Sequence, residues 1–144
     1  MKIYNISIAS DHSGLLIKQE IIAHLSKMGH KVIDLGPYDD ASVDYPDYAN
    51  LLCENIIEQS SQFGILICRT GIGMSIAANR HSGVRAALCT TIAMAELARL
   101  HNDANVIVLG GGIVDNDTNI TLIDKFLNTS FEGGRHIKRL AKIS

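Results

Sequence analysis

The chain of 144 residues contains no tryptophan and only two prolines, and its aromatic fraction is 5%. With so few aromatic side chains, a buried core must be built from aliphatic residues, and a hydrophobic fraction of 47% supplies enough of them. That fraction excludes disorder as the main state. The length predicts one domain spanning residues 1–144.

Other absences exclude whole classes of partner. No apolar run approaches the roughly twenty residues of a membrane helix, and the first residues lack the long apolar segment of a signal peptide. The net charge of −2 provides no basic field for nucleic acid. Cys53, Cys68 and Cys89 are odd in number and lack CxxC or zinc-finger spacing, so neither a disulfide framework nor structural zinc is expected. We therefore expect no membrane or nucleic-acid partner and a location in the reducing cytoplasm.

What the chain does contain is a regular alternation of short β-rich runs and longer helical patterns. Strands are expected at 3–9, 30–36, 64–68, 83–89 and 105–112. Helices are expected at about 17–28, 45–59, 91–100 and 120–127, with a short one after the third strand and one in the tail from about 134. This order predicts an α/β, three-layer Rossmann-like fold, in which about five parallel strands carry helices on both faces.

In such a fold, ligands bind beyond the carboxyl ends of the strands. The residues that follow the first strand are Asp11 and His12, those that follow the third are Cys68, Arg69 and Thr70, and glycines 110–112 end the fifth. These positions are the candidates for a functional site.

The segment after the third strand reads Cys68-Arg69-Thr70-Gly71-Ile72-Gly73-Met74-Ser75. Its glycines let the backbone approach a ligand, and the amides at a helix start favour an anionic oxygen. The segment lacks the ending of a P-loop, and a dinucleotide fingerprint would follow the first strand instead. We favour an anion-binding turn over a plain strand-to-helix connection, because a thiol and a hydroxyl flank the turn.

Among the single residues, Cys68 is the strongest candidate for a catalytic role. A thiolate there would lie beside helix N-terminal amides and Arg69, which suits a base or a nucleophile. Cys53 and Cys89 fit the commoner role of small buried hydrophobic residues. Asp11 is explained equally well as a helix cap.

Two segments near the C-terminus remain open to two interpretations. Arg135 and Arg139 lie four apart, so a helical tail would place both on one face, either as a solvated surface or as a phosphate clamp. His101-Asn102-Asp103 fits a helix end, and we find no spacing there that predicts a metal site.

Together these residues resemble the family of ribose-5-phosphate isomerase B, which also holds the galactose-6-phosphate isomerase subunits. The similarity runs nearly end to end. It rests on five segments in order: Ser10-Asp11-His12-Ser13-Gly14, Asp44-Tyr45-Pro46, residues 65–79 around Cys68, His101-Asn102-Asp103-Ala104-Asn105-Val106, and Glu132-Gly133-Gly134-Arg135-His136.

The resemblance implies interconversion of D-ribose 5-phosphate and D-ribulose 5-phosphate, a step of the pentose phosphate pathway, without metal or cofactor. Cys68 would be the base that moves a proton between C2 and C1 through an enediolate. Thr70 and the amides of Gly71 to Ser75 would bind the oxyanion. His101 would open the sugar ring with help from Asp11, and the remaining implied substrate ligands are Tyr45 and Asn102 for the hydroxyls, and His12, Arg135 and Arg139 for the phosphate.

The resemblance also implies a homodimer or homotetramer whose active sites lie between subunits, with the C-terminal helix at the interface. His101 and part of the phosphate clamp would then act in trans. Two positions depart from the family pattern: Arg69 stands where glycine is common, and Gly110-Gly111-Gly112 lacks a common arginine. Our hypothesis is that Arg69 offsets the lost charge or favours the Cys68 thiolate.

Two alternatives stay open. One is an isomerase of a six-carbon sugar phosphate, such as allose 6-phosphate or galactose 6-phosphate. The other is a non-catalytic sugar-phosphate sensor, which would keep the glycine turn and the arginines but would not need Cys68.

Overall fold

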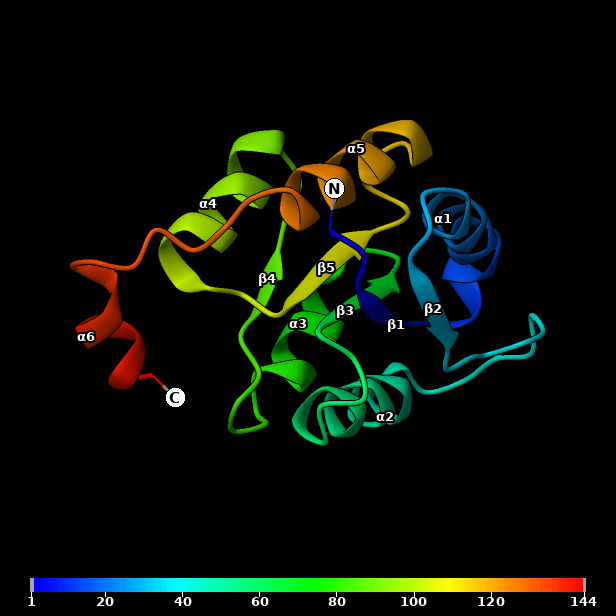
Figure 1. The fold of residues 1–144 in the computed structure, drawn as a ribbon. Coiled ribbons are helices and arrows are strands. Elements are labelled where there is room, and N and C mark those ends of the chain that lie inside the picture. The colour runs from blue at the N-terminus through cyan, green and yellow to red at the C-terminus, as the bar shows by residue number, and fades with distance from the viewer. Residues whose placement is uncertain (1, 144) are drawn as a thin grey trace.

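A computed structural model describes residues 2–143 and shows a five-stranded sheet in the order β2-β1-β3-β5-β4 (Figure 1). All neighbouring strands are parallel. The strands are β1 (Asn5–Ser10), β2 (Lys31–Asp34), β3 (Phe63–Cys68), β4 (Ala86–Leu88) and β5 (Val106–Gly110). The helices are η1 (His12–Gly14), α1 (Leu15–Lys27), α2 (Tyr45–Ile57), α3 (Ile72–Ala78), α4 (Ile92–Asn102), α5 (Asn116–Leu127) and α6 (His136–Ala141).

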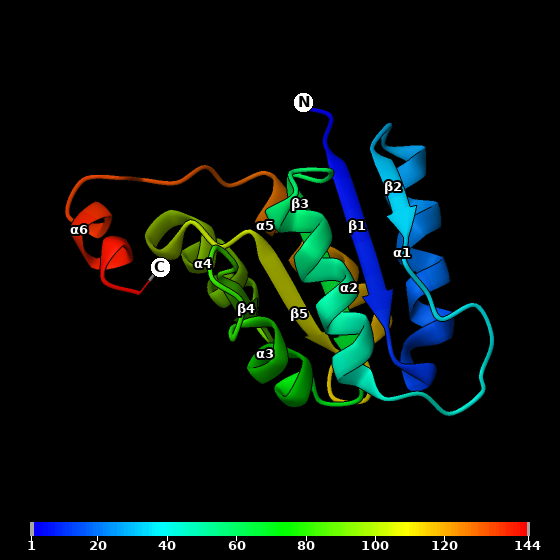
Figure 2. The ribbon, with the colours of Figure 1, turned by 90° about the horizontal axis from the view of Figure 1, so that it is seen from below.

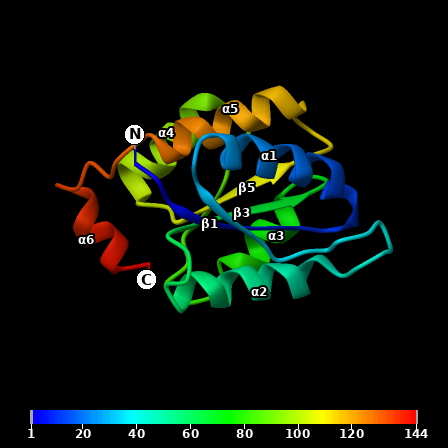
Figure 3. The same cartoon turned by 45° about the vertical axis from the view of Figure 1, so that its right-hand side comes forward.

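The two central strands β3 and β5 are buried along their whole lengths, which explains why their sequences are continuous apolar runs rather than alternating ones. One apolar core packs α1, α4 and α5 against one face of the sheet, and a second packs α2 and α3 against the other. Figure 3 shows these two helical layers on opposite sides of the strands. The predicted three-layer α/β fold is confirmed.

The main difference from the predicted elements lies in the edge strand. The expected strand at 83–89 shortens to β4, because side chains satisfy the neighbouring backbone. Directly before β4, the Arg85 amide donates to the side-chain Oδ1 of Asn105 at 2.8 Å, and Asn79 exchanges two hydrogen bonds with Ala86, the first residue of the strand. No helix within residues 2–143 is long and apolar enough to span a membrane.

The topology defines where a ligand can enter. The chain leaves β1 toward β2 on one side and leaves β3 toward β5 and β4 on the other, so the order reverses between β1 and β3. Their carboxyl ends meet in register, with Ser10 opposite Ile67. A crevice at such a reversal is the usual ligand site of an open parallel sheet. Figure 2 shows α6 at the side of the molecule, beside α4 and away from the strand arrowheads.

Candidate active site

Cys68 ends β3 in the middle of the sheet, opposite Gly110 of β5. The residue is only 6% exposed, and its Sγ accepts a hydrogen bond from the Gly71 amide at 3.1 Å. Gly71 has φ +81°, and a Cβ there would lie 2.5 Å from a methyl carbon of Leu88. Only glycine fits this turn, and the turn is what brings a backbone N–H donor onto the thiol.

The turn also presents hydrogen-bond donors to its open side. Thr70 Oγ1 accepts from the Ile72 amide at 3.1 Å, and the Ser75 amide bonds to Gly71 O at 3.0 Å. Within residues 2–143, the amides of Gly73 and Met74 have no acceptor. Of the five amides expected to bind an oxyanion, these two are therefore the free donors.

A cavity of about 480 Å³ opens above Cys68. Its lining residues come from the segment after β1, from α2, and from the end of β3 through the following turn into α3: Asp11, Tyr45, Cys68, Arg69, Thr70, Ile72, Gly73 and Ile76. The Tyr45 ring lies directly on Gly73, where a Cβ would be 2.5 Å from the ring carbons. The structure thus brings most of the predicted residues of the carboxyl edge into one cavity. Ile76 was not predicted, because an exposed isoleucine one helical turn beyond Ile72 carries no chemical signal.

Asp11 acts as a cap as well as a cavity residue. Its Oδ1 accepts from the Ser13 amide at 3.0 Å and from the Ser13 hydroxyl at 2.6 Å. These bonds hold the carboxylate at the mouth of the crevice, so the two interpretations of Asp11 are compatible.

His12 lies in an adjoining hollow of about 430 Å³ rather than in the Cys68 cavity. Its Nδ1 accepts a hydrogen bond from the Val43 amide at 3.2 Å. Because that nitrogen is an acceptor, the neutral ring carries its proton on Nε2. The imidazole is therefore oriented to donate from Nε2 to an anionic oxygen.

Arg69 and Gly112 are direct neighbours. The Gly112 amide donates to Arg69 O at 2.8 Å, and a Cβ on Gly112 would lie 2.8 Å from Cγ of Arg69. The Arg69 side chain therefore occupies the space above the glycine turn that follows β5. The two departures from the family pattern meet at one place in the structure.

A second group of predicted residues lies elsewhere. His101 and Asn102 end α4 immediately before β5 begins, so they belong to the amino edge of the sheet, opposite Cys68. Asn102 lines a separate hollow of about 440 Å³. Arg135 and Arg139 are exposed at the start and on the outer turn of α6. The predicted site residues of one chain thus form two groups at opposite edges of its sheet, which we call the Cys68 half-site and the second half-site.

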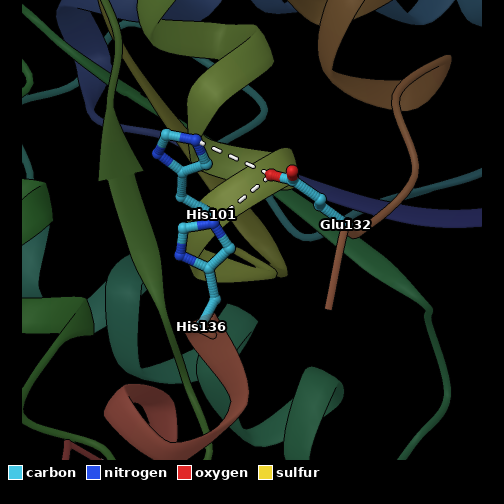
Figure 4. A group of neighbouring side chains, drawn as sticks. All are labelled: His101, Glu132 and His136. Atoms are coloured by element: carbon cyan, nitrogen blue, oxygen red, sulfur yellow. Dashed lines mark hydrogen bonds and ion pairs between the residues drawn. The ribbon is translucent and has the colours of Figure 1, made fainter. Parts of the chain in front are cut away.

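The second half-site contains a cluster that sequence reasoning missed. His101, Glu132 and His136 converge, with both imidazole Nε2 atoms directed at the Glu132 carboxylate (Figure 4). The spacing of Glu132 and His136, four residues apart, was the available signal. Their approach to His101, more than thirty residues earlier, depends on the path of the chain after α5.

The other two cysteines behave as buried apolar residues. Burial raises the pKa of both the Cys53 and the Cys89 thiol to about 12. Neither lines the cavity above Cys68. Their predicted structural role is confirmed by their positions in the two cores.

These features define an α/β protein with a thiol and free backbone amides in a crevice at the reversal of its sheet. A family model described as Ribose/Galactose Isomerase matches residues 6–143, and the chain belongs to that family. A putative sugar phosphate isomerase of Rickettsia bellii is 57% identical over 143 residues, which cover 99% of both proteins.

Solved structures agree with this assignment. A ribose 5-phosphate isomerase of Thermotoga maritima has a TM-score of 0.96 at 48% identity, covering 97% of each chain. A ribose-5-phosphate isomerase B of Mycoplasma genitalium, solved with bound ribulose-5-phosphate, has a TM-score of 0.93 at 48% identity, covering 96% of this chain and 93% of the other.

Proposed function

We propose that this protein interconverts D-ribose 5-phosphate and D-ribulose 5-phosphate. The observation that carries the proposal is the Cys68 thiol at the floor of the crevice, beside Thr70 and the free amides of Gly73 and Met74. Relatives named for this activity support the choice of a pentose phosphate, as does the ribulose-5-phosphate bound to the Mycoplasma structure.

In the proposed reaction Cys68 acts as the base. The Cys68 thiolate takes the C2 proton of the open-chain aldose and returns it to C1, while the hydroxyl proton of O2 passes to O1. Between these transfers the substrate is an enediolate, whose negative oxygen is bound by the amides of Gly73 and Met74 with Thr70. No electrons leave the substrate, so the step requires no external oxidant or reductant.

Ring opening and phosphate binding draw on the second half-site. We assign His101 as the ring-opening proton donor with Asp11 as its helper, and Tyr45 and Asn102 as ligands of the sugar hydroxyls. The phosphate ligands are His12, Arg135 and Arg139. Because His101 lies at the opposite edge of its own sheet from Cys68, the complete site needs a second copy of the chain, and we propose a homodimer as the minimal active unit.

The position of Arg69 above Gly112 suggests that Arg69 provides the positive charge toward the substrate phosphate that the glycine turn lacks. Arg69→Gly should raise the KM for ribose 5-phosphate by about tenfold, the loss of one charge-assisted hydrogen bond. The double variant Arg69→Gly with Gly112→Arg should restore it, because removing the Arg69 side chain frees the space above Gly112. Unchanged KM in the single variant would show that Arg69 faces solvent.

The decisive experiment for the proposed function uses deuterated water. Purified protein is incubated with ribose 5-phosphate, and NMR follows ribulose 5-phosphate formation and deuterium entry at C1. Interconversion with exchange supports proton transfer by an enzyme base. Binding without interconversion would favour a sensor, and faster turnover of allose 6-phosphate or galactose 6-phosphate would move the substrate to the six-carbon class.

A further inference from the structure

The cluster of His101, Glu132 and His136 has the chemistry of a metal site. Two imidazole nitrogens and a carboxylate oxygen lie within 4.8 Å of one another. His136 Nε2 is 3.3 Å from Glu132 Oε2, and His101 Nε2 is 3.9 Å from the same oxygen. We propose that these three side chains bind a divalent transition ion of the zinc type.

One of the distances in the cluster already matches the ligand separation of such an ion. Zinc–nitrogen and zinc–oxygen bonds are about 2.0–2.2 Å, so two ligands of a tetrahedral ion lie about 3.4 Å apart. The 3.3 Å separation of His136 Nε2 from Glu132 Oε2 matches this value, and the other ligand atoms, which lie within 4.8 Å of one another, must move closer when an ion binds. Imidazole and carboxylate ligands favour zinc, nickel or copper over magnesium or calcium.

The backbone holds the cluster together before any ion arrives. The Glu132 amide donates to Leu100 O at 3.1 Å, which ties the segment after α5 to the end of α4. Gly133 and Gly134 both have positive φ, and this tight turn places His136 against His101. The two imidazoles stack with ring centroids 4.3 Å apart and an interplanar angle of 21°.

The exposure of the three side chains allows an ion to enter and leave the site. The side chains of His101 and Glu132 are 37% and 53% exposed, whereas that of His136 is 8% exposed. The buried ligand is therefore anchored, and the open side leaves a fourth position for water. The site shares His101 with the proposed ring-opening machinery, so a bound ion would block that step and act as an inhibitor.

Metal binding can be measured independently of catalysis. Untagged protein is stripped with EDTA and titrated with zinc chloride by calorimetry in the Cys68→Ala background, which removes the thiol that lines the cavity as a competing ligand. We expect one ion per chain and no heat from magnesium. Glu132→Gln and His136→Asn should each weaken zinc binding at least about tenfold. The matched control is His24→Asn, because His24 also faces a carboxylate, Asp124 at 2.8 Å, but belongs to no three-ligand group within residues 2–143.

Equal zinc affinity in the parent, Glu132→Gln and His136→Asn would overturn the proposal, as would the absence of zinc binding. Glu132→Gln alters an exposed side chain, so it keeps the test valid if His136→Asn fails to fold. The inhibitory consequence rests on the proposed function and is tested separately. Zinc should slow the wild-type isomerase reversibly, and His136→Asn should need more zinc for the same effect. An inactive wild type that still binds zinc would contradict the proposed function and leave the metal site standing.

Discussion

Replacing Cys68 with alanine separates the proposed catalytic role of its thiol from its structural role. Cys68 Sγ is the acceptor for the Gly71 amide, and leaving that amide without a partner costs about 1–3 kcal/mol of the free energy of unfolding. Domains of this kind are stable by about 5–15 kcal/mol, so a loss of 2 kcal/mol leaves more than about 99% of the protein folded. If Cys68 is the base that we propose, its removal should by contrast lower kcat by about 10³. A fall of that size cannot come from unfolding.

Cys89→Ala is the matched control. It deletes the same atom from a residue that is 1% exposed and lies in the other core, so stability should fall by about 1–2 kcal/mol and activity should stay within about twofold. Activity is measured as ribulose 5-phosphate formation, and stability as urea unfolding followed by circular dichroism. A Cys68→Ala variant that keeps more than about a tenth of wild-type kcat would refute Cys68 as the base.

Alkylation tests the reactivity of the Cys68 thiol by an independent method. Because burial raises the pKa of Cys53 and Cys89 to about 12, only about one in ten thousand of these thiols is ionised at pH 8. Iodoacetamide at that pH should therefore label Cys68 first, and ribose 5-phosphate should slow the labelling. Peptide mass spectrometry reads the outcome, and equal labelling of all three cysteines would contradict it.

Three further predictions follow from single contacts. Gly73→Ala places a methyl group 2.5 Å from ring carbons of Tyr45, so the ring must rotate away from the cavity floor. The KM for ribose 5-phosphate should then rise by about tenfold, with little change in thermal stability. Asp34→Asn removes the negative charge that lies 2.7 Å from the fully buried Lys18 ammonium. Urea titration should show that the free energy of unfolding falls by about 2 kcal/mol. No loss would mean that the Pro37 carbonyl alone is enough to stabilise the buried ammonium. Burial lowers the pKa of His30, so the unfolded chain binds a proton on this residue more readily than the folded chain does. The free energy of unfolding should therefore fall as the pH decreases through about 6.5. His30→Asn should make the free energies from urea titrations at pH 7.5 and 5.5 more nearly equal.

The parts of the fold that were predictable are those set by local pattern. Continuous apolar runs, as in Phe63–Cys68, indicate the buried strands. Helix α2 begins at Tyr45 with Pro46 in its first turn, where the missing backbone amide has no hydrogen bond to lose. The edge strand was predicted too long because its length is decided by remote side chains. The Asn105 side chain bonds the amide of Arg85, which a longer strand would have used.

The sequence by itself determined the fold class, the turn after Cys68 and the candidate residues at the carboxyl edge, because each rests on residue order and short-range periodicity. Only the tertiary structure decided which amides of that turn remain free, that Arg69 covers Gly112, and that His101 lies at the opposite edge from Cys68 beside Glu132 and His136. These relations depend on distances between segments far apart in the chain. Such distances are set by how the helices pack on the sheet, and no local pattern encodes them.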